Sequence, residues 1–547
     1  MESTVIDETK REGKISSPDS TLNKDWRFWL VIFSMCLIGF LVALDGSIIG
    51  IALPRISNEL QLEEQYVWVV NSFWIAQTVF QPLVAQCSNI FGRRTPMILS
   101  VAIVAIGSVV AGACSSKDML IVGRTIQGLG SAGTMLLMEV IVCDIVPLRE
   151  RGKYLSITLS CCAVGAISGP PIGGAIAEKS WRWIFYMNVP ISGVVLAVMI
   201  PFMRLKHTPQ PWTRALSQID WIGNIIFVMA LTSLLIGLVF GGAVFSWGSW
   251  RVVVPIVLGV AGWVAFHIWE TSKICKVPVI PRRIVGNRTS LACLVLVFMS
   301  SVLTTWINFQ WQLYWQAVRG ASPLRSGVNS IVYQAFSIPS AAVAGQILSR
   351  LGVYRPIHFV SFSILTLGSG LNTILTTTTP TAVWAVLVAL NGIGIGIILP
   401  TVLPAILSSL AESDVAAASG VYSFARSFGF LWGSTIPTVI FNTSFDRFIG
   451  LIHDPPIRDT LRNGRAYQYA SGSFLSTLPQ PVKAEVIDVF LKSIRVGWQV
   501  AIAFAALGLV FVCLERHYPM RKSLESDYGI ENEGENKIGG KEGQSGA

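Results

Sequence analysis

The sequence predicts an all-α integral membrane protein, built of two six-helix bundles and two additional transmembrane helices. Composition is the first observation: the 547 residues are 52% hydrophobic and only 13% charged, whereas soluble chains carry about 25% charged residues. The second is that apolar residues form long runs, with the charged residues in short clusters between them. A net charge of +10 spread in this way is typical of loops beside an anionic leaflet, not of a nucleic-acid-binding domain.

Roughly fourteen runs reach the length of about 20 apolar residues that a membrane-spanning helix needs. We interpret the seventh and eighth as a hairpin inserted between two sets of six. The runs are 29–50, 66–86, 95–114, 119–143, 155–177, 184–203, 221–243, 251–270, 289–312, 326–348, 356–376, 381–404, 414–440 and 497–515. The predicted parts are a tail at 1–27, a first bundle at 28–206, a linker with two spans at 207–286, a second bundle at 287–516 and a disordered tail at 517–547.

The positions of Lys and Arg predict the orientation of the helices. With the N-terminus inside, the inside loops and tails hold roughly 23 of these residues, against roughly 7 in the short outside loops. An even number of spans then places both termini in the cytosol. The first apolar run is too long for a signal peptide. One long loop, 441–496, falls outside, and the sequon at Asn442 makes it a candidate glycosylation site.

A short repeat relates the two predicted bundles. Gly92, followed by Arg93 and Arg94, comes after the second run of the first bundle. Gly352, followed by Arg355, comes after the second run of the later bundle. Two homologous halves around a central site are a known plan of transporters.

Four charged residues lie at membrane depth, where each costs about 2.5–3.5 kcal/mol on insertion scales. Asp45 either titrates and carries a proton or hydrogen-bonds across a helix interface. Arg124 stays charged and therefore needs a carboxylate or carbonyl groups around it. Asp45 and Glu139 are the candidate proton carriers, with an interfacial position as the alternative for Glu139. Arg426, in the thirteenth run, has no obvious acid near it in the sequence.

The fifth run is dense in glycine and proline. This composition weakens a helix in water, but inside a bundle it permits a kink and close contact between backbones. Two interpretations are open, a seam between moving parts or a purely structural kink. The residues concerned are Gly165, Gly169, Pro170, Gly173 and Gly174.

Two runs carry polar and aromatic residues at helical spacing, so each set shares one face. Amides and indoles that line a cavity suit an amphipathic organic ligand. An aromatic belt at the membrane surface is the alternative for Trp315. The candidate substrate-binding residues are Asn71, Trp74, Gln81, Asn308, Trp311 and Gln312.

The sequence lacks the common motifs for nucleotide binding, hydrolysis and metal binding. There is no Gly-x-x-x-x-Gly-Lys-[Ser/Thr] loop for ATP and no His-Glu-x-x-His or Gly-x-Ser-x-Gly motif. The nine cysteines show no metal-ligand spacing. We therefore expect neither an enzyme nor a bound cofactor or metal.

The order of these motifs resembles the major facilitator superfamily over about residues 28–516, and within it the fourteen-span drug:proton antiporters that include fungal toxin and drug efflux pumps. Any one motif is weak, but their order over so much of the chain is specific. The matching segments are Leu44–Ile49 with Ala52–Pro54, Arg124 with Gln127, Gly128 and Gly130, Asp144–Gly152, the glycines of the fifth run, Trp181–Phe185 with Asn188–Pro190, and Arg319–Gly327.

The resemblance implies a major facilitator fold and proton-coupled export of small organic molecules by alternating access, with Arg124 assisting proton movement. The implied partners are the substrate, protons and the lipid bilayer, without nucleic acid, for a monomer in the plasma or vacuolar membrane. Gly92, Arg93 and Arg94 match the family's gating loop, but neutral Asn89 stands where the family has Asp. Asn89 can form hydrogen bonds but no ion pair. Whether this chain has the family's usual gating lock is therefore an open question at this stage.

Other functions stay open at this stage. An uptake or vacuolar carrier of siderophores or basic amino acids has the same fold, and only the motif of the fifth run favours export. A polytopic membrane enzyme needs a clustered catalytic set, and the sequence shows none. A sensor that no longer transports is a further alternative.

Overall fold

The described chain is helical. A computed structural model describes residues 25–60, 66–203, 205, 211–241, 245, 247–273, 275, 278, 280–411, 414–462, 466–467, 469–470 and 472–520. An isolated bridge joins Gly241 to Phe245. Most of the expected tails, 1–27 and 517–547, lie outside the described residues.

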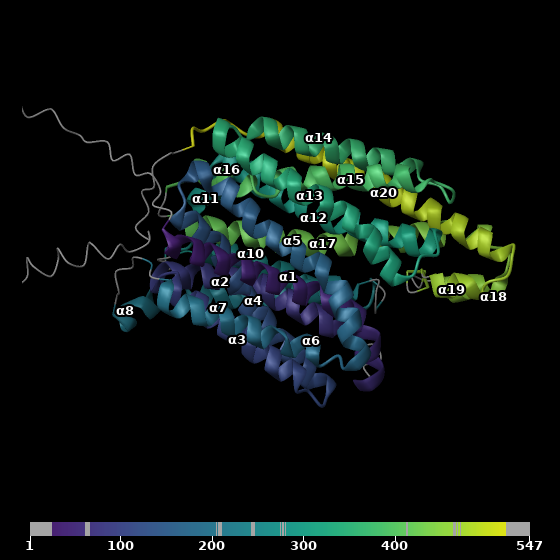
Figure 1. Ribbon diagram of the computed structural model, residues 1–547, viewed down its shortest axis with the longest axis horizontal. Coiled ribbons are helices and arrows are strands. Elements are labelled where there is room, and N and C mark those ends of the chain that lie inside the picture. Colours follow the sequence, from purple (N-terminus) through teal and green to yellow (C-terminus); the bar gives the residue numbers. More distant parts are fainter. Residues whose placement is uncertain are drawn as a thin grey trace, which may run out of the picture.

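The first half of the molecule is a bundle of long helices (Figure 1). Helix α1 packs on α5 and α7, while α2 and α3 both pack on α4. Apolar residues on nearly every side of these helices provide the packing surface. The bounds are α1 Trp26–Leu60, α2 Tyr66–Phe91, α3 Arg94–Gly112, α4 Lys117–Ile145, α5 Leu148–Lys179, α6 Trp183–Tyr186 and α7 Asn188–Phe202.

A helical hairpin follows, formed by α9 and α10, which pack on each other. The ring of Phe227 in α9 lies 5.2 Å from that of Phe266 in α10 and 5.4 Å from that of Phe424 in the second half. Because α9 also packs on α2, the hairpin lies where the two halves meet. The bounds are α8 Trp212–Ser217, α9 Trp221–Phe240, α10 Trp250–Thr271 and α11 Arg282–Gly286.

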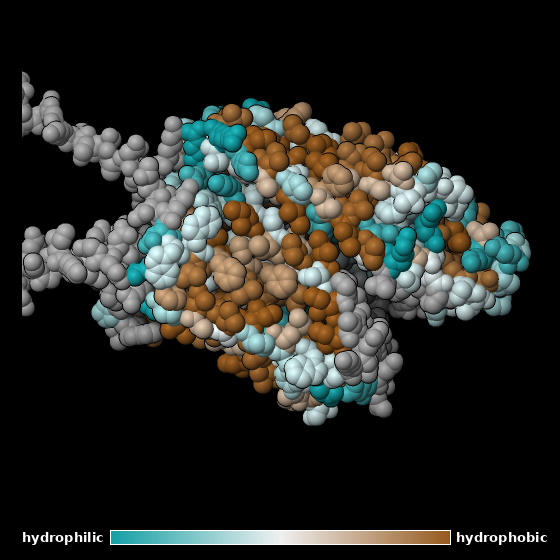
Figure 2. All heavy atoms as spheres, in the orientation of Figure 1, coloured by the Kyte–Doolittle hydropathy of each residue, from teal (hydrophilic) through white to brown (hydrophobic). Residues whose placement is uncertain are grey.

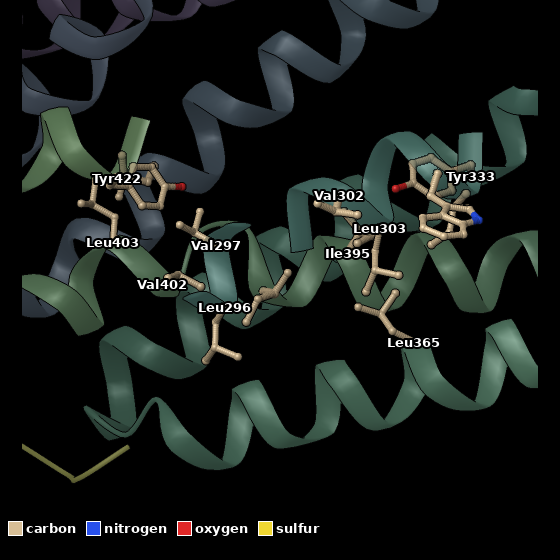
Figure 3. Close-up of a cluster of buried hydrophobic side chains, with 14 of the residues drawn as sticks. Leu296, Val297, Val302, Leu303, Tyr333, Leu365, Ile395, Val402, Leu403 and Tyr422 are labelled. Atoms are coloured by element: carbon tan, nitrogen blue, oxygen red, sulfur yellow. The ribbon is translucent and has the colours of Figure 1, made fainter. Parts of the chain in front are cut away.

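The second half repeats the plan of the first: α12 packs on α17 and α20, and α13 and α14 both pack on α15. Its core is a cluster of buried side chains that includes Leu296, Leu365 and Leu403 (Figure 3). The bounds are α12 Arg288–Leu313, the π-helical turn Tyr314–Val318, α13 Pro323–Leu351, α14 Arg355–Leu371, α15 Thr381–Ile398, α16 Val402–Ser408, α17 Val415–Phe448, α18 Pro455–Leu461, α19 Gly472–Thr477 and α20 Val482–Leu514.

Eleven helical segments of the described residues are long and apolar enough to cross a membrane, judged by length and composition. Three further long helices, α2, α5 and α17, coincide with predicted runs but are more polar. Part of their polarity is turned inward, as with Gln81 and Arg426, which are 0% and 3% exposed. The space-filling view shows hydrophobic residues over the middle of the molecule and hydrophilic residues toward its ends (Figure 2).

Both ends of the described chain lie at one end of the bundle, at the left of Figure 1, and α18 and α19 lie at the other. We call these the termini end and the far end. At the far end α17 continues to Phe448 and α20 begins at Val482, so the predicted boundaries of the loop at 441–496 are wrong. Apolar content marks only the part of a helix that suits lipid, whereas the helix itself continues through polar residues. Asn442 lies inside α17, 9% exposed, and accepts a hydrogen bond from the Tyr467 amide (3.3 Å), a setting that does not favour glycosylation.

The two repeated glycines have the same backbone conformation. Gly92 follows α2 with φ 76°, and Gly352 follows α13 with φ 71°. Only glycine adopts positive φ at little cost, so each ends a helix and turns the chain into the next one. The Gly352 amide donates to the Leu348 carbonyl, 2.8 Å away. The sequence repeat therefore corresponds to one structural turn used in both halves.

Candidate functional site

A cavity of about 590 Å³ lies between the two halves. Helices α1, α2, α4 and α5 line it from the first half, and α12, α13, α15 and α17 line it from the second. Most of its lining surface is apolar, although the lining residues include four amides, eight hydroxyls and a single Arg. This volume falls in the range of sites that bind drug-sized molecules.

Three of the predicted substrate-binding residues line the cavity, namely Trp74, Asn308 and Gln312. The Asn308 amide donates to the Thr304 carbonyl (2.8 Å), and the Gln312 amide donates to the Ser330 hydroxyl (2.7 Å). Because these contacts lie within the second half, they fix the two amides at the wall of the cavity. Their contact with a substrate stays a prediction.

The other three predicted substrate-binding residues do not line the cavity. Trp311 is 2% exposed, and its ring lies 5.5 Å from Trp315 and 5.9 Å from Trp498. Trp311 and Gln312 are about 100° apart on a helix, so one points into the cavity and the other into the core. Gln81 donates to the Ser427 hydroxyl (3.2 Å) and so joins α2 to α17. Asn71 lies on α2 outside the lining.

Glu139 of α4 and Arg426 of α17 form a buried ion pair between the halves. The Arg426 Nη1 donates to Glu139 Oε1, and the Ser423 hydroxyl donates to Oε2 from 2.7 Å. Glu139 is 1% exposed and does not line the cavity, whereas Arg426 does. Arg426 therefore has an acid partner that the sequence did not indicate, because the two residues are 287 positions apart.

A second buried ion pair lies within the first half. The Arg124 Nη1 is 2.7 Å from Asp45 Oδ2, and the Arg124 Nε donates to the Val69 carbonyl from 3.2 Å. The sequence predicted a carboxylate or carbonyl groups around Arg124, and the structure shows one carboxylate, Asp45, and one carbonyl, Val69. Asp45 Oδ1 also accepts from the Asn188 amide (2.7 Å), and Gln127 accepts from Arg124 (2.9 Å). Asp45 thus joins α1 to α4 and α7, which is the interface role weighed for it, and a proton-carrying role stays a prediction.

The predicted gating loop forms an ion pair without an acid at position 89. The Arg93 Nε lies 2.8 Å from Asp144 Oδ2 at the end of α4. The Arg93 Nη1 donates to the Ser88 carbonyl (2.6 Å) and to Asn89 Oδ1 (3.0 Å). Asn89 therefore takes the hydrogen bond that a neutral side chain was expected to take. Sequence reasoning missed Asp144 as a partner, although the matching segment Asp144–Gly152 contains it.

The glycines of the fifth run bring α5 against α1. A Cβ atom on Gly165 would collide with the Phe40 carbonyl, one on Gly169 with the Ser47 hydroxyl, and one on Gly173 with Ile48. Close approach of two backbones through small residues is a common way of packing membrane helices. Helix α5 runs without interruption from Leu148 to Lys179. Pro170 and Gly174 belong to α5, but the surroundings of these two residues lie outside what the structure describes.

The halves touch at the termini end of the cavity. The Ser156 hydroxyl of α5 donates to the Ala341 carbonyl of α13 (2.9 Å), and the Arg149 Nε donates to the Ser349 carbonyl (2.7 Å). A Cβ atom on Gly345 of α13 would collide with the Gly152 carbonyl. These contacts close the termini end between α5 and α13.

Two clusters hold side chains of the types that bind metal ions, with ligand atoms within 4.8 Å of one another. In the first, His358 Nδ1 is 2.7 Å from Glu515 Oε1, and the Cys293 thiol donates to the same oxygen from 3.3 Å. Its three residues are fully buried and tie α12 and α14 to the end of α20. The second cluster, Asp220, Glu270 and Cys275, lies beside the hairpin. In the first, one oxygen of Glu515 takes part in both hydrogen bonds.

Two helical halves around a central cavity define a polytopic membrane transporter. The chain matches the family description "Major Facilitator Superfamily" over residues 35–434. It therefore belongs to the major facilitator superfamily and is a multi-pass membrane protein of a transporter family, not an enzyme family.

The chain is similar to fungal efflux pumps. It is 45% identical to the MFS efflux transporter aclA of Aspergillus oryzae, over 96% of each chain. It is 38% identical to the efflux pump FUS6 of Gibberella moniliformis, over 94% of this chain and 92% of that one. Among solved structures it shares its fold with the human organic anion transporter MFSD10 (TM-score 0.58, 13% identity), over 88% of this chain and 99% of that one.

Proposed function

We propose that this protein exports small organic molecules of the secondary-metabolite class by proton-coupled alternating access. Support for export comes from relatives that are named efflux transporters over nearly their whole length. Support for a small organic substrate comes from the mainly apolar cavity of about 590 Å³. In this proposal the fourteen long helices all cross the membrane, α2, α5 and α17 included.

The single observation that carries the coupling is the ion pair between Glu139 and Arg426. It joins α4 to α17 beside the cavity, so moving the halves apart on that side separates the two charges. Protonation of Glu139 removes one charge and weakens the contact. A proton therefore has a different affinity for the two states of the bundle, which coupling requires. Asp45 is the second candidate carrier, since it pairs with Arg124.

We further propose that both termini face the cytosol and that the protein resides in the plasma membrane. The excess of Lys and Arg expected on the inside supports this orientation. The contacts between α5 and α13 then close the cytosolic side, so the described conformation is the one that faces outward. Gly165, Gly169 and Gly173 supply the close packing of α1 and α5 in this state.

Proton-driven transport in inside-out vesicles tests the proposal. Wild type is compared with Asp45→Asn and Glu139→Gln while a panel of dyes and fungal toxins is offered under an imposed pH gradient. We expect the wild type to accumulate at least one compound and one of the variants to lose only the gradient-dependent part. Movement in the opposite direction would identify an uptake carrier. Transport that ignores the gradient in all three proteins would overturn the proton coupling.

A further inference from the structure

We infer that the cavity selects molecules that present an acceptor oxygen, such as a carboxylate, enolate or carbonyl, to Arg426 on a mainly apolar body, and that it rejects lipophilic cations. This inference names the substrate class of the proposed export site and rests on that proposal for its biological meaning. Its physical basis is that Arg426 lines the cavity whereas its ion-pair partner Glu139 does not.

Arg426 is the one charged residue among the described residues that line the cavity. Its partner Glu139 is withdrawn from the lining, and both Glu139 oxygens are occupied, one by Arg426 and one by Ser423. The pair is neutral as a whole, but the residue of the pair that lines the cavity is the cation and not the anion. A bound molecule therefore meets the guanidinium first.

The other buried carboxylate of this region does not offset that asymmetry. Asp45 directly precedes two lining residues, Gly46 and Ser47, but is not part of the lining itself. Its two oxygens accept hydrogen bonds from Arg124 and Asn188 inside the first half. Both acids near the cavity are thus satisfied by protein donors, and neither is available to a cationic ligand.

The remaining lining residues are neutral, and most of the surface that they expose to the cavity is apolar, which fits an apolar body. Trp74 lies over Gly46, where its ring would be 3.3 Å from an added Cβ atom, and supplies a flat apolar surface. Asn308 and Gln312 supply amides at the opposite wall. In such surroundings the field of a fixed charge is weakly screened. A carboxylate then gains a charge-assisted hydrogen bond to the guanidinium fork, whereas an ammonium meets a like charge.

Binding of three matched fluorescent probes to the purified protein in lipid nanodiscs tests this inference. The probes are pyrenebutyric acid, pyrenebutyramide and pyrenebutylamine, which share the apolar body and differ in the polar group. Energy transfer from the protein's tryptophans to pyrene reports binding. We expect the acid to bind most tightly, the amide next, and the amine about tenfold or more weakly than the acid. Equal or tighter binding of the amine, or no binding of the acid, would overturn the inference.

Variants assign the preference to Arg426. Because Arg426→Gln alone leaves Glu139 buried and unpaired, the informative variant is the double substitution Glu139→Gln with Arg426→Gln, which keeps the site neutral. We expect the preference for acid over amine to fall to about onefold in the double variant and to be reduced but present in Arg426→Lys. Arg319→Gln, which removes an exposed charge outside the lining, is the control and should keep the preference. A double variant with the preference intact would contradict the inference.

The binding assay uses no pH gradient, so it separates this inference from the proposed function. Discrimination among the probes without gradient-driven movement of the acid would sustain the inference and sink proton-coupled export. Gradient-driven export of the amine at the same rate as the acid would support proton-coupled export and contradict the inference about selectivity.

Discussion

The guanidinium of Arg426 in α17 lies against the carboxylate of Glu139 in α4, and this contact joins the two halves of the bundle beside the central cavity. Both side chains are almost fully buried. A buried charge without its partner is costly, while loss of both charges together is not. The pair therefore acts at once as a structural link and as a candidate site of proton coupling.

Single neutralisation of this pair should destabilise the protein far more than double neutralisation. We expect Glu139→Gln and Arg426→Gln each to lower the free energy of unfolding by about 3–5 kcal/mol, because each leaves one buried charge unpaired. The double variant should be close to wild type. Thermal unfolding in detergent measures all three, and additive losses in the double variant would show that the residues do not act as a pair.

Arg124 should not tolerate replacement by Lys. Its guanidinium donates from separate nitrogens to Asp45 and to the Val69 carbonyl, a geometry that a single ammonium group cannot reproduce. We expect Arg124→Lys to cost about 2 kcal/mol or more of stability and to reduce transport severely. Arg319→Lys is the matched control, since Arg319 is exposed and makes one contact to a carbonyl. If Arg124→Lys and Arg319→Lys changed stability and transport equally, the separate contacts of the Arg124 guanidinium would not be what position 124 requires.

The glycine contacts of α5 should be sensitive to a single methyl group. In Gly165→Ala the added Cβ meets the Phe40 carbonyl of α1, and we expect a loss of about 1–3 kcal/mol. Gly193→Ala in α7 is the control, because nothing lies within 4 Å of a Cβ atom there. The control should be neutral or slightly stabilising, since alanine favours helix over glycine. Thermal unfolding measures both variants. A larger loss of stability in Gly193→Ala than in Gly165→Ala would contradict the close packing of α5 on α1.

A larger side chain placed between α5 and α13 should separate these two helices and open the cavity at the termini end. A larger side chain in Gly345→Val cannot fit against the Gly152 carbonyl, so the population should shift toward the opposite state. The measurement is labelling of Asn308→Cys, in a cysteine-free background, by an impermeant maleimide added from the termini side. We expect labelling to rise severalfold over the background protein. Gly286→Val, at an open position, is the control, and equal labelling in both would argue against a gate here.

Local sequence features predicted the helices and the turns well. The apolar runs marked the long helices, and Gly92 and Gly352 marked two turns that share a positive φ. The limits of α17 and α20 were wrong, because a helix continues into polar residues where hydropathy no longer marks it. The π-helical turn at Tyr314–Val318 left no signal that we recognised.

The polar faces were predicted less well than the helices that carry them. Gln312 and Trp311 were assigned to one helix face, but they are about 100° apart on the helix. Gln312 lines the cavity, whereas Trp311 packs in the core. Periodicity says which residues share a side of a helix, but not where the neighbouring helix stands. Gln81 likewise shares a stripe with Trp74 yet bonds to Ser427 instead of lining the cavity.

By itself the sequence determined the membrane class, the helical runs, the two-half plan and the charged residues that need partners, because lipid imposes length, apolarity and charge satisfaction on each helix separately. The tertiary structure alone decided that Arg426 pairs with Glu139, that Arg93 pairs with Asp144 and that Arg426 lines the cavity. Those pairings depend on the packing of helices far apart in the chain. No local pattern encodes that packing, since the same buried charge is satisfied equally well by any acid that the fold brings to it.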